Sequence, residues 1–407
     1  MDNSLLTIDH SQFTIFGARK MEQKKKPRIA ILGTRGYPTV YSGYETWLKE
    51  LCDHLHDQYE IHVYCHRSFF KEKPKMVNGV WLHYIPSIET KILSQITNSS
   101  IATLHALFMN YDLYFFVNMA NGPFGAFLHF FGKRTAINTD GIEWDRPKWK
   151  GLGGKYFRWA AGVAARFMDV LVTDAYGMQN FYRKHFQSDS VMIAYGAHVT
   201  ESHKPELIEQ YGLKKDDYYL TVGRLIPDNH VEEIVTGFMK CNSPKKLVVV
   251  GGVTYKDEFA TRMKAMASEK IIFTDYVRDQ QLLMELYANS YCYIHGHAFG
   301  GTNPALLKAL AYGCCVLAHD NKFNRETLQD DKHGYYFHGT PDELKIAVEK
   351  IDVMNEEVLQ KKAISRQRIT ENFTWEKICR QYDELFQKLI TDKKWEMNKG
   401  TWREEKQ

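Results

Sequence analysis

The sequence lacks both the cysteine pattern of a disulfide-bonded protein and the ligand spacing of a metalloprotein. Its seven cysteines are scattered over 407 residues, only Cys314 and Cys315 are adjacent, and no Cys-x-x-Cys pair occurs. An odd and unpatterned set indicates reduced thiols in a cytosolic protein. The 17 histidines form no His-Glu-x-x-His or comparable spacing, so no metal site is predicted.

The sequence also lacks an apolar run that would direct secretion or cross a membrane. The stretch Met1–Glu22 is polar and mixed, so we expect no signal peptide and treat residues 1–26 as a polar extension. The only long uncharged run, Leu113–Gly132, contains asparagines, glycines and Pro123, which would interrupt a spanning helix. A buried strand, a loop and a helix explain this run better.

A strong charge of either sign is absent as well. The formal net charge is +4 and the sequence pI is about 8.4. Such mild basicity fits an anionic substrate or an anionic membrane surface and is too weak to argue for nucleic acid. A hydrophobic share of 44% and a charged share of 25% are typical of a globular protein, and the length favours two or three domains.

Short apolar runs alternate with helical stretches, which predicts doubly wound parallel sheets. The first series of strand-like runs is Arg28–Gly33, Ile61–Cys65, Val80–Ile85, Leu113–Val117, Thr135–Asn138, Asp169–Asp174 and Val191–Tyr195. A second series is Tyr218–Val222, Lys246–Gly251, Ile271–Thr274 and Ser290–Ile294. The polar segment Thr200–Pro205 between the two series is the expected linker, so each series predicts a separate α/β domain.

Two glycine-rich turns follow predicted strands. The first, Gly33–Gly43, leads into a helix, as at the opening of a nucleotide-binding α/β unit, but it is not Gly-x-Gly-x-x-Gly, which disfavours a dinucleotide dehydrogenase. In the second, Gly300 and Gly301 precede Thr302-Asn303-Pro304, a helix-start signal. A helix N-terminus flanked by glycine suits a diphosphate, although an ordinary strand-to-helix turn has the same pattern.

A dense polar loop follows the run that ends at Asn138. It contains Asp140, Glu143, Trp144 and Arg146. Carboxylates accept hydroxyl protons or act as a base, tryptophan offers a flat face to a sugar ring, and arginine holds phosphate. We therefore predict that these four residues bind an acceptor, with Asp140 as a catalytic candidate; a solvated loop with a packed tryptophan is the alternative.

The stretch Lys148–Arg166 interleaves basic and aromatic residues. Such an amphipathic helix can rest on an anionic bilayer surface. A helix that packs on the core and turns a cationic side to water explains the pattern equally well. We therefore predict peripheral contact with the cytoplasmic face of the inner membrane as one of two open interpretations.

Several ordered motifs resemble the family 4 glycosyltransferases, and within them the bacterial rhamnosyltransferases. The matching stretches are Gly33-Thr34-Arg35-Gly36, Gly43-Tyr44-Glu45-Thr46, Thr139-Asp140-Gly141-Ile142-Glu143-Trp144, Val222-Gly223-Arg224-Leu225, Gly301-Thr302-Asn303-Pro304 and Asn324-Arg325-Glu326. The resemblance covers Pro27 to about Leu389. It implies the GT-B fold, an α/β architecture in which two Rossmann-like doubly wound domains face each other across a cleft.

The resemblance also implies a division of the chain and of its site. Residues 27–205 would form the acceptor domain, residues 206–373 the donor domain, residues 374–390 a helix that returns to the first domain, and residues 391–407 a polar tail. Arg224 would clamp the donor diphosphate and join Asp140 as a catalytic residue. The donor-binding set would be Gly36, Gly43, Arg224, Asn229, Tyr276, Val277, Gly300, Gly301, Thr302, Asn303, Lys308 and Glu326, with no metal and no cofactor beyond the nucleotide sugar.

The chain departs from the family pattern at two positions. The usual motif is a Glu-x7-Glu pair, but Gly300 stands at the first position and Lys308 at the second. In the family the second Glu bonds the nucleotide ribose. Thymidine nucleotides lack the ribose 2′-hydroxyl, so we hypothesise that the chain tolerates Lys308 because its donor is dTDP-L-rhamnose. Lys308 would then pair with phosphate, or with Glu326 or Asp320. A charge reversal could equally signal lost activity.

The resulting hypothesis is a retaining rhamnosyltransferase that acts on a lipid-linked saccharide precursor of a cell-surface polysaccharide such as a capsule or O-antigen. Its partners would be the nucleotide sugar and the lipid-linked acceptor, without nucleic acid. Two alternatives stay open: a transferase of the same fold that uses a UDP- or GDP-sugar, and a catalytically silent relative that binds a nucleotide sugar.

Overall fold

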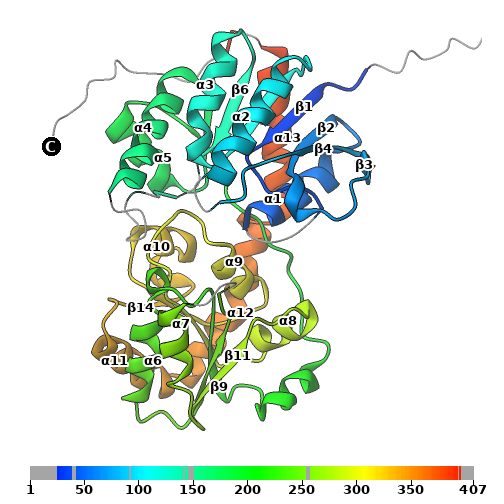
Figure 1. Ribbon diagram of the computed structural model, residues 1–407. Helices are drawn as coiled ribbons and strands as arrows, with labels where there is room; N and C mark the ends of the chain where they lie inside the picture. The colour runs from blue at the N-terminus through cyan, green and yellow to red at the C-terminus, as the bar shows by residue number, and fades with distance from the viewer. Residues whose placement is uncertain are drawn as a thin grey trace, which may run out of the picture.

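The computed structural model describes residues 25–395, except residues 39–42, 91–92, 140, 143, 145–150, 254–256 and 393. Two parallel sheets with helices on both faces lie one above the other (Figure 1). We call the part built on the first sheet the first domain and the part built on the second sheet the second domain. The alternation of apolar runs and helices predicted both.

The sheet of the first domain has the strand order β3-β4-β2-β1-β5-β6-β7-β8. Its strands are β1 (Arg28–Leu32), β2 (Glu60–His66), β3 (Met76–Val77), β4 (Val80–Ile85), β5 (Leu113–Val117), β6 (Thr135–Asn138), β7 (Val170–Thr173) and β8 (Val191–Met192). All pairs are parallel except β3 with β4. The expected run to Tyr195 is wrong in length, because the strand geometry of β8 ends at Met192.

Helices cover both faces of this sheet. They are α1 (Gly43–Leu55), α2 (Leu93–Leu107), α3 (Gly122–Phe130), α4 (Leu152–Phe167) and α5 (Tyr176–Phe186). The run Leu113–Gly132 forms β5, the 3-10 turn η2 (Met119–Asn121) and α3, as predicted. Throughout the described part of the chain, no helix is long and apolar enough to span a bilayer.

The second sheet has the order β11-β10-β9-β12-β13-β14, with every pair parallel. Its strands are β9 (Tyr218–Val222), β10 (Lys246–Val250), β11 (Ile271–Asp275), β12 (Cys292–His295), β13 (Val316–His319) and β14 (Tyr335–Phe337). Its helices are α6 (Val231–Met239), α7 (Glu258–Lys264), α8 (Gln280–Ala288), α9 (Pro304–Ala311), α10 (Lys322–Leu328), α11 (Pro341–Asp352) and α12 (Asn355–Asn372), with the 3-10 turn η7 (Asp330–Lys332) after α10.

The last described helix, α13 (Trp375–Thr391), returns from the second domain to the first and lies along α1 (Figure 1). Tyr382 is buried between rings of the first domain, with centroids 5.3 Å from Trp47 and 5.9 Å from Phe115. Its hydroxyl accepts a hydrogen bond of 3.1 Å from Asn138 Nδ2. The apolar stripe of this helix therefore belongs to the core of the first domain.

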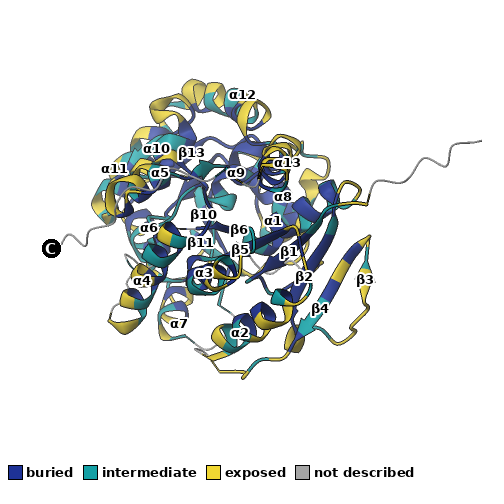
Figure 2. Cartoon of the chain, turned by 90° about the horizontal axis from the view of Figure 1, so that it is seen from above, coloured by how far each residue is buried: buried dark blue, intermediate teal, exposed yellow. Residues whose placement is uncertain are grey.

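Buried residues follow the strands and the inner faces of the helices, and exposed residues lie on the outer faces (Figure 2). All seven cysteines are free and buried. Burial raises the pKa of the Cys65, Cys241, Cys314 and Cys379 thiols to about 12. These cysteines are packing residues, since a reactive cysteine needs an accessible thiolate.

A cluster of histidine and tyrosine lies beside β2 and β4. His83 Nε2 is 3.0 Å from His62 Nδ1 and 3.4 Å from the Tyr111 hydroxyl, and its ring stacks on Tyr64 and packs on His105. Burial lowers the pKa of His83 to about 4, with a smaller contribution from the nearby histidines and Arg28. Burial also lowers the pKa of His62, so His62 and His83 both favour the neutral imidazole.

This cluster predicts an acid-sensitive fold. Between pH 6.5 and about 4, the His83 imidazole is protonated in the unfolded chain and neutral in the folded protein. Stability should therefore fall as the pH drops through that window, by up to about 1.4 kcal/mol per pH unit for one proton. The thermal midpoint measured from pH 4.5 to 7.5 should show this slope, and His83→Gln should reduce it. The exposed His203→Gln is the matched control; equal slopes in all three proteins would contradict the assignment.

Candidate active site

The carboxyl ends of strands from the two sheets meet at the domain interface. Asp174 follows β7 in the first domain, and the turn Gly300–Asn303 follows β12 in the second. The Thr302 hydroxyl donates to the backbone oxygen of Asp174. In sheets of this kind, ligands bind at the carboxyl ends of the strands. The interface is therefore the candidate site.

Two helix N-termini, one from each domain, meet here. Gly43 is the first residue of α1 and Pro304 the first of α9, and a Cβ added to Gly43 would lie 3.2 Å from Pro304 Cγ. Asn303 caps α9 as predicted, since its side chain accepts a hydrogen bond of 2.9 Å from Ala305 N. Both helix dipoles turn their positive ends toward this place, which favours an anion.

Glycines let the strand ends of the second domain approach closely. A Cβ on Gly251 would lie 1.8 Å from Gly223 O, and one on Gly296 would lie 2.1 Å from Asn229 O. Asn229 is buried, and its Nδ2 donates to Arg224 O over 2.8 Å. The predicted donor-binding Asn229 thus anchors the loop that carries Arg224, whose own side chain is exposed at the end of β9.

Tyr276 and Val277, predicted to bind the donor, follow β11. The Tyr276 side chain is exposed and Val277 is buried. The loop is fixed at its far end by Asp279, whose carboxylate accepts from Gln281 N and Leu282 N at the start of α8. An exposed ring on a fixed loop offers a flat surface for stacking.

Lys308 lies in α9, and burial lowers the pKa of its ammonium group. The expectation that Lys308 pairs with Glu326 or Asp320 is wrong, because both carboxylates take other partners. Asp320 accepts two hydrogen bonds from Arg325, of 2.5 and 2.7 Å. Pairing with a phosphate remains the prediction for Lys308.

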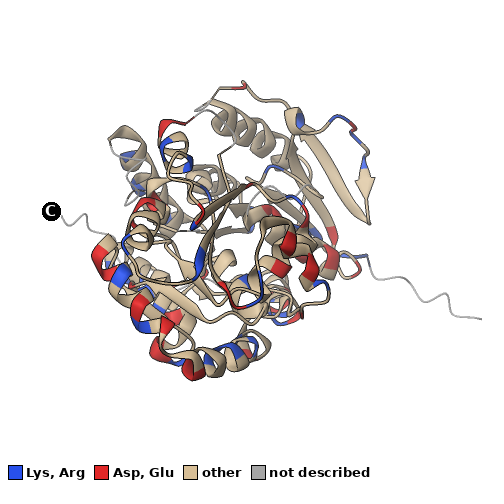
Figure 3. Cartoon of the chain, turned by 90° about the horizontal axis from the view of Figure 1, so that it is seen from below, with Lys and Arg blue, Asp and Glu red and all other residues tan. Residues whose placement is uncertain are grey.

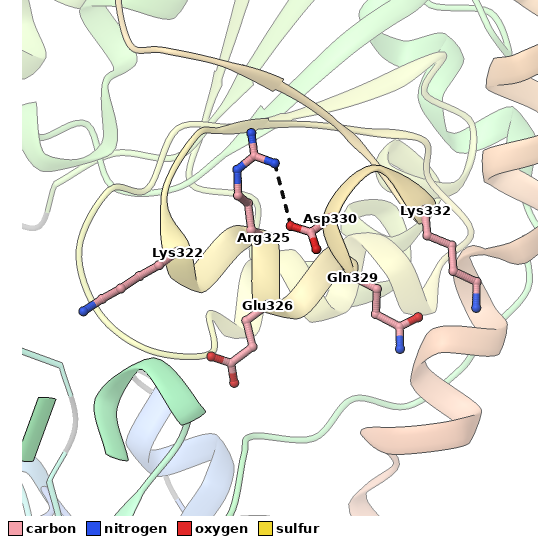
Figure 4. A pocket seen from close by; sticks show the side chains of 6 residues that line it. All are labelled: Lys322, Arg325, Glu326, Gln329, Asp330 and Lys332. Carbon is pink, nitrogen blue, oxygen red and sulfur yellow. Dashed lines mark ion pairs between the residues drawn. The ribbon is translucent and has the colours of Figure 1, made fainter. Parts of the chain in front are cut away.

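Glu326 reaches across the interface. Its Oε1 accepts from Tyr176 N over 2.7 Å and its Oε2 from Gly177 N over 2.9 Å, so its carboxylate caps α5 of the first domain. Figure 4 shows this side chain turned away from the Arg325–Asp330 pair. In this structure Glu326 is a contact between domains, and its donor-binding role stays a prediction.

A hollow of about 650 Å³ lies on α10 and η7 beside Glu326 (Figure 4). Its other lining residues are Lys322, Arg325, Gln329, Asp330 and Lys332. Arg325 is held by Asp320 and lies 3.7 Å from Asp330, so its charge is already compensated. The hollow contains neither Arg224 nor the turn Gly300–Asn303, and we place the candidate site at those residues instead.

Asp140, Glu143 and Arg146 lie outside the described residues. Trp144 is described, and its ring packs against Phe181 and Phe186 of α5, with centroids 5.7 and 6.2 Å apart. Gly36 lies away from α9: with φ +127°, a Cβ there would lie 2.7 Å from Cys65 Sγ. Neither contact tests the acceptor or donor roles predicted for these residues.

The sequence analysis did not single out Asp174, His295 at the end of β12, or His297 just after it. Asp174 is only 2% exposed and lies against Gly301. His295 is fully buried, and His297 stacks on it with centroids 4.6 Å apart. Their position could have indicated them, because all three residues lie at or just after the carboxyl ends of strands.

Two family models match the chain. Residues 203–372 match "Glycosyl transferases group 1", and residues 91–198 match "Domain of unknown function (DUF1972)". An uncharacterized glycosyltransferase of Methanocaldococcus jannaschii is 24% identical over 86% of this chain and 95% of its own. An N-acetylgalactosamine-N,N'-diacetylbacillosaminyl-diphospho-undecaprenol 4-alpha-N-acetylgalactosaminyltransferase of Campylobacter jejuni is 27% identical over 35% of this chain and 38% of its own.

Solved structures share the architecture. A sucrose-phosphate synthase from Thermosynechococcus elongatus has a TM-score of 0.78 at 13% identity, covering 90% of this chain and 99% of its own. HepE of Anabaena in complex with UDP-glucose has a TM-score of 0.72 at 13% identity, covering 89% and 99%. The fold is GT-B, as predicted. Over residues 203–372, the second domain is similar to the group 1 glycosyl transferases.

The close fit of Gly301 against Asp174 is testable. A Cβ at residue 301 would lie 1.7 Å from Asp174 Oδ1, so Gly301→Ala should push the domains apart and cost about 1–3 kcal/mol of stability. Small-angle scattering should show a larger radius of gyration, and the thermal midpoint should fall. Gly252→Ala, where a Cβ would meet nothing within 4 Å, should change neither quantity. An unchanged Gly301→Ala protein would show that this contact does not hold the domains.

Proposed function

We propose that this chain is a retaining glycosyltransferase that moves L-rhamnose from dTDP-L-rhamnose onto a lipid-linked saccharide precursor of a cell-surface polysaccharide. The observation that carries the proposal is the meeting of α1 and α9 at their N-termini. Together with the exposed Arg224 at the end of β9, these termini form a site suited to a diphosphate between the two domains.

The transfer step follows from this arrangement. The bond between the anomeric carbon and the diphosphate oxygen breaks, and a bond to the acceptor hydroxyl oxygen forms on the same face. The hydroxyl proton passes to the departing diphosphate. Arg224 and the N-terminus of α9 stabilise the charge that grows on the diphosphate, and contact between the domains excludes water.

Two side chains support a thymidine nucleotide as the donor. The exposed ring of Tyr276 gives the base a face to stack on. Lys308 in α9 supplies a cation where a carboxylate would otherwise hold a ribose 2′-hydroxyl, and thymidine nucleotides lack that hydroxyl. UDP-sugars are the alternative donors, because HepE, a protein of similar fold, was solved with UDP-glucose.

A broad apolar face of the first domain supports a lipid-linked acceptor. Helices α2, α3 and α4 contain no Asp or Glu. Their exposed apolar residues, with those that directly follow α2 and α3, are Leu93, Ile96, Ile101, Leu104, Phe108, Phe127, Phe130, Phe131, Leu152 and Trp159. Lys155, Arg158 and Arg166 add positive charge on α4. By contrast, the outer helices of the second domain carry many charges of both signs (Figure 3). Such a face suits the surface of an anionic bilayer.

Nucleotide selectivity tests the donor assignment. The thermal midpoint is measured with dTDP, UDP, GDP, ADP and NAD⁺, and turnover with the sugar form of each stabilising nucleotide. We expect dTDP to raise the midpoint with concentration and dTDP-L-rhamnose to be turned over. Arg224→Ala should lower turnover about 100- to 1000-fold, whereas Arg183→Ala, on the far end of α5, should not. A higher thermal midpoint with UDP or GDP would assign that nucleotide to the donor instead of dTDP. An unchanged midpoint with every nucleotide would indicate a catalytically silent relative.

Vesicle binding tests the membrane face. Leu152→Glu with Trp159→Glu should reduce binding to phosphatidylglycerol vesicles at least tenfold, because it removes exposed apolar area and adds negative charge. Binding of the unaltered protein should weaken with salt. Ile346→Glu with Val353→Glu, at exposed apolar sites on the second domain, is the matched control. Equal binding by both variants would exclude α4 as the docking surface.

A further inference from the structure

We infer that Asp174 of the first domain supplies the carboxylate that faces the donor sugar, a group that the donor-binding turn of the second domain does not carry. This inference rests on the proposed function and adds a residue to its chemistry. The turn and its helix contain no acidic residue, since the chain has none between Glu285 and Asp320. Any carboxylate at this point must therefore come from elsewhere.

The turn also excludes a carboxylate of its own by its geometry. Gly300 has φ +105°, a backbone conformation that side chains other than glycine rarely adopt. At Gly301 the space for a side chain is already filled, because a Cβ there would lie 1.7 Å from Asp174 Oδ1 and 2.3 Å from Asp174 Cγ. The carboxylate of Asp174 thus occupies the volume that a side chain of the turn would occupy.

The surroundings hold Asp174 in that position. It follows β7, is 2% exposed, and its backbone oxygen accepts from the Thr302 hydroxyl. Two residues further on, Tyr176 N and Gly177 N donate to Glu326. The second domain therefore contacts the segment Asp174–Gly177 at both of its ends. These contacts fix the Asp174 carboxylate before a donor binds. Groups fixed in this way stabilise charge without reorganisation.

A carboxylate near this turn would assist the proposed transfer. A diphosphate at the N-terminus of α9 would place its sugar within reach of Gly301 and therefore of Asp174. As the bond to the diphosphate breaks, positive charge grows on the anomeric carbon and the ring oxygen. The carboxylate of Asp174 stabilises that charge, and the acceptor proton goes to the departing diphosphate.

The alternative is that Asp174 only fills space between the domains. Asp174→Asn separates the two roles, because the amide keeps the shape and removes the charge. We expect turnover of dTDP-L-rhamnose to fall 100- to 1000-fold, while dTDP affinity and the thermal midpoint stay close to those of the unaltered protein. Asp189→Asn, which removes a surface carboxylate paired with Arg183 in the same domain, should leave turnover unchanged.

A second variant makes the test independent of the amide. Asp174→Ala leaves room for a small anion, so added formate should restore turnover at least tenfold if a carboxylate is what the site needs, and chloride should not. Turnover of Asp174→Asn within threefold of the unaltered protein would overturn the inference. A joint loss of turnover, dTDP affinity and thermal midpoint without formate rescue would do so as well, in favour of a packing role. Failure of the unaltered protein to bind or turn over any nucleotide sugar would instead reject the proposed function.

Discussion

The burial of α13 on the first domain is the constraint on which the arrangement of the two domains depends. Seven of its residues, Trp375, Ile378, Cys379, Tyr382, Leu385, Phe386 and Leu389, are buried. Burying a large apolar side chain contributes about 1.5–3 kcal/mol relative to exposure. The two crossings between domains lie side by side, because Ala197 pairs with Thr374 and a Cβ on Gly196 would meet the Trp375 ring at 2.6 Å. The two crossings therefore join the domains at one place.

Away from α13, the interface combines close backbone approaches with the ring of Phe323 from α10, which packs in an apolar cluster of the first domain. The turn Gly300–Asn303 contacts the end of β7, Gly43 contacts Pro304, and the Glu326 carboxylate caps α5. Hydrogen bonds and close backbone approaches thus join the two domains at this place. A donor diphosphate held between α1 and α9 would add charged interactions to both sides. The residues proposed to bind the donor are thus the same ones that join the two domains.

The sequence allowed the fold to be predicted almost completely. Continuous apolar runs such as Leu113–Val117 are typical of strands covered on both faces, and Asn303-Pro304 marks a helix start by its own chemistry. The family resemblance singled out Arg224, whose side chain is exposed at a strand end, and its donor-binding role stays a prediction. Contacts between the domains could not be predicted, because nothing in the local sequence indicates that Glu326 caps α5 or that Asp174 fills the space beside Gly301. The expected partners of Lys308 were also wrong, because Asp320 accepts from Arg325 and Glu326 caps α5.

The burial of every cysteine has a practical consequence for observing domain motion. Thiol-reactive dyes couple to accessible thiolates, and each of the seven native thiols is enclosed in a core. One new cysteine on the outer side of each domain could be labelled without removing the native ones. Energy transfer between the two dyes would then report the distance between the domains in single molecules, in the otherwise natural sequence.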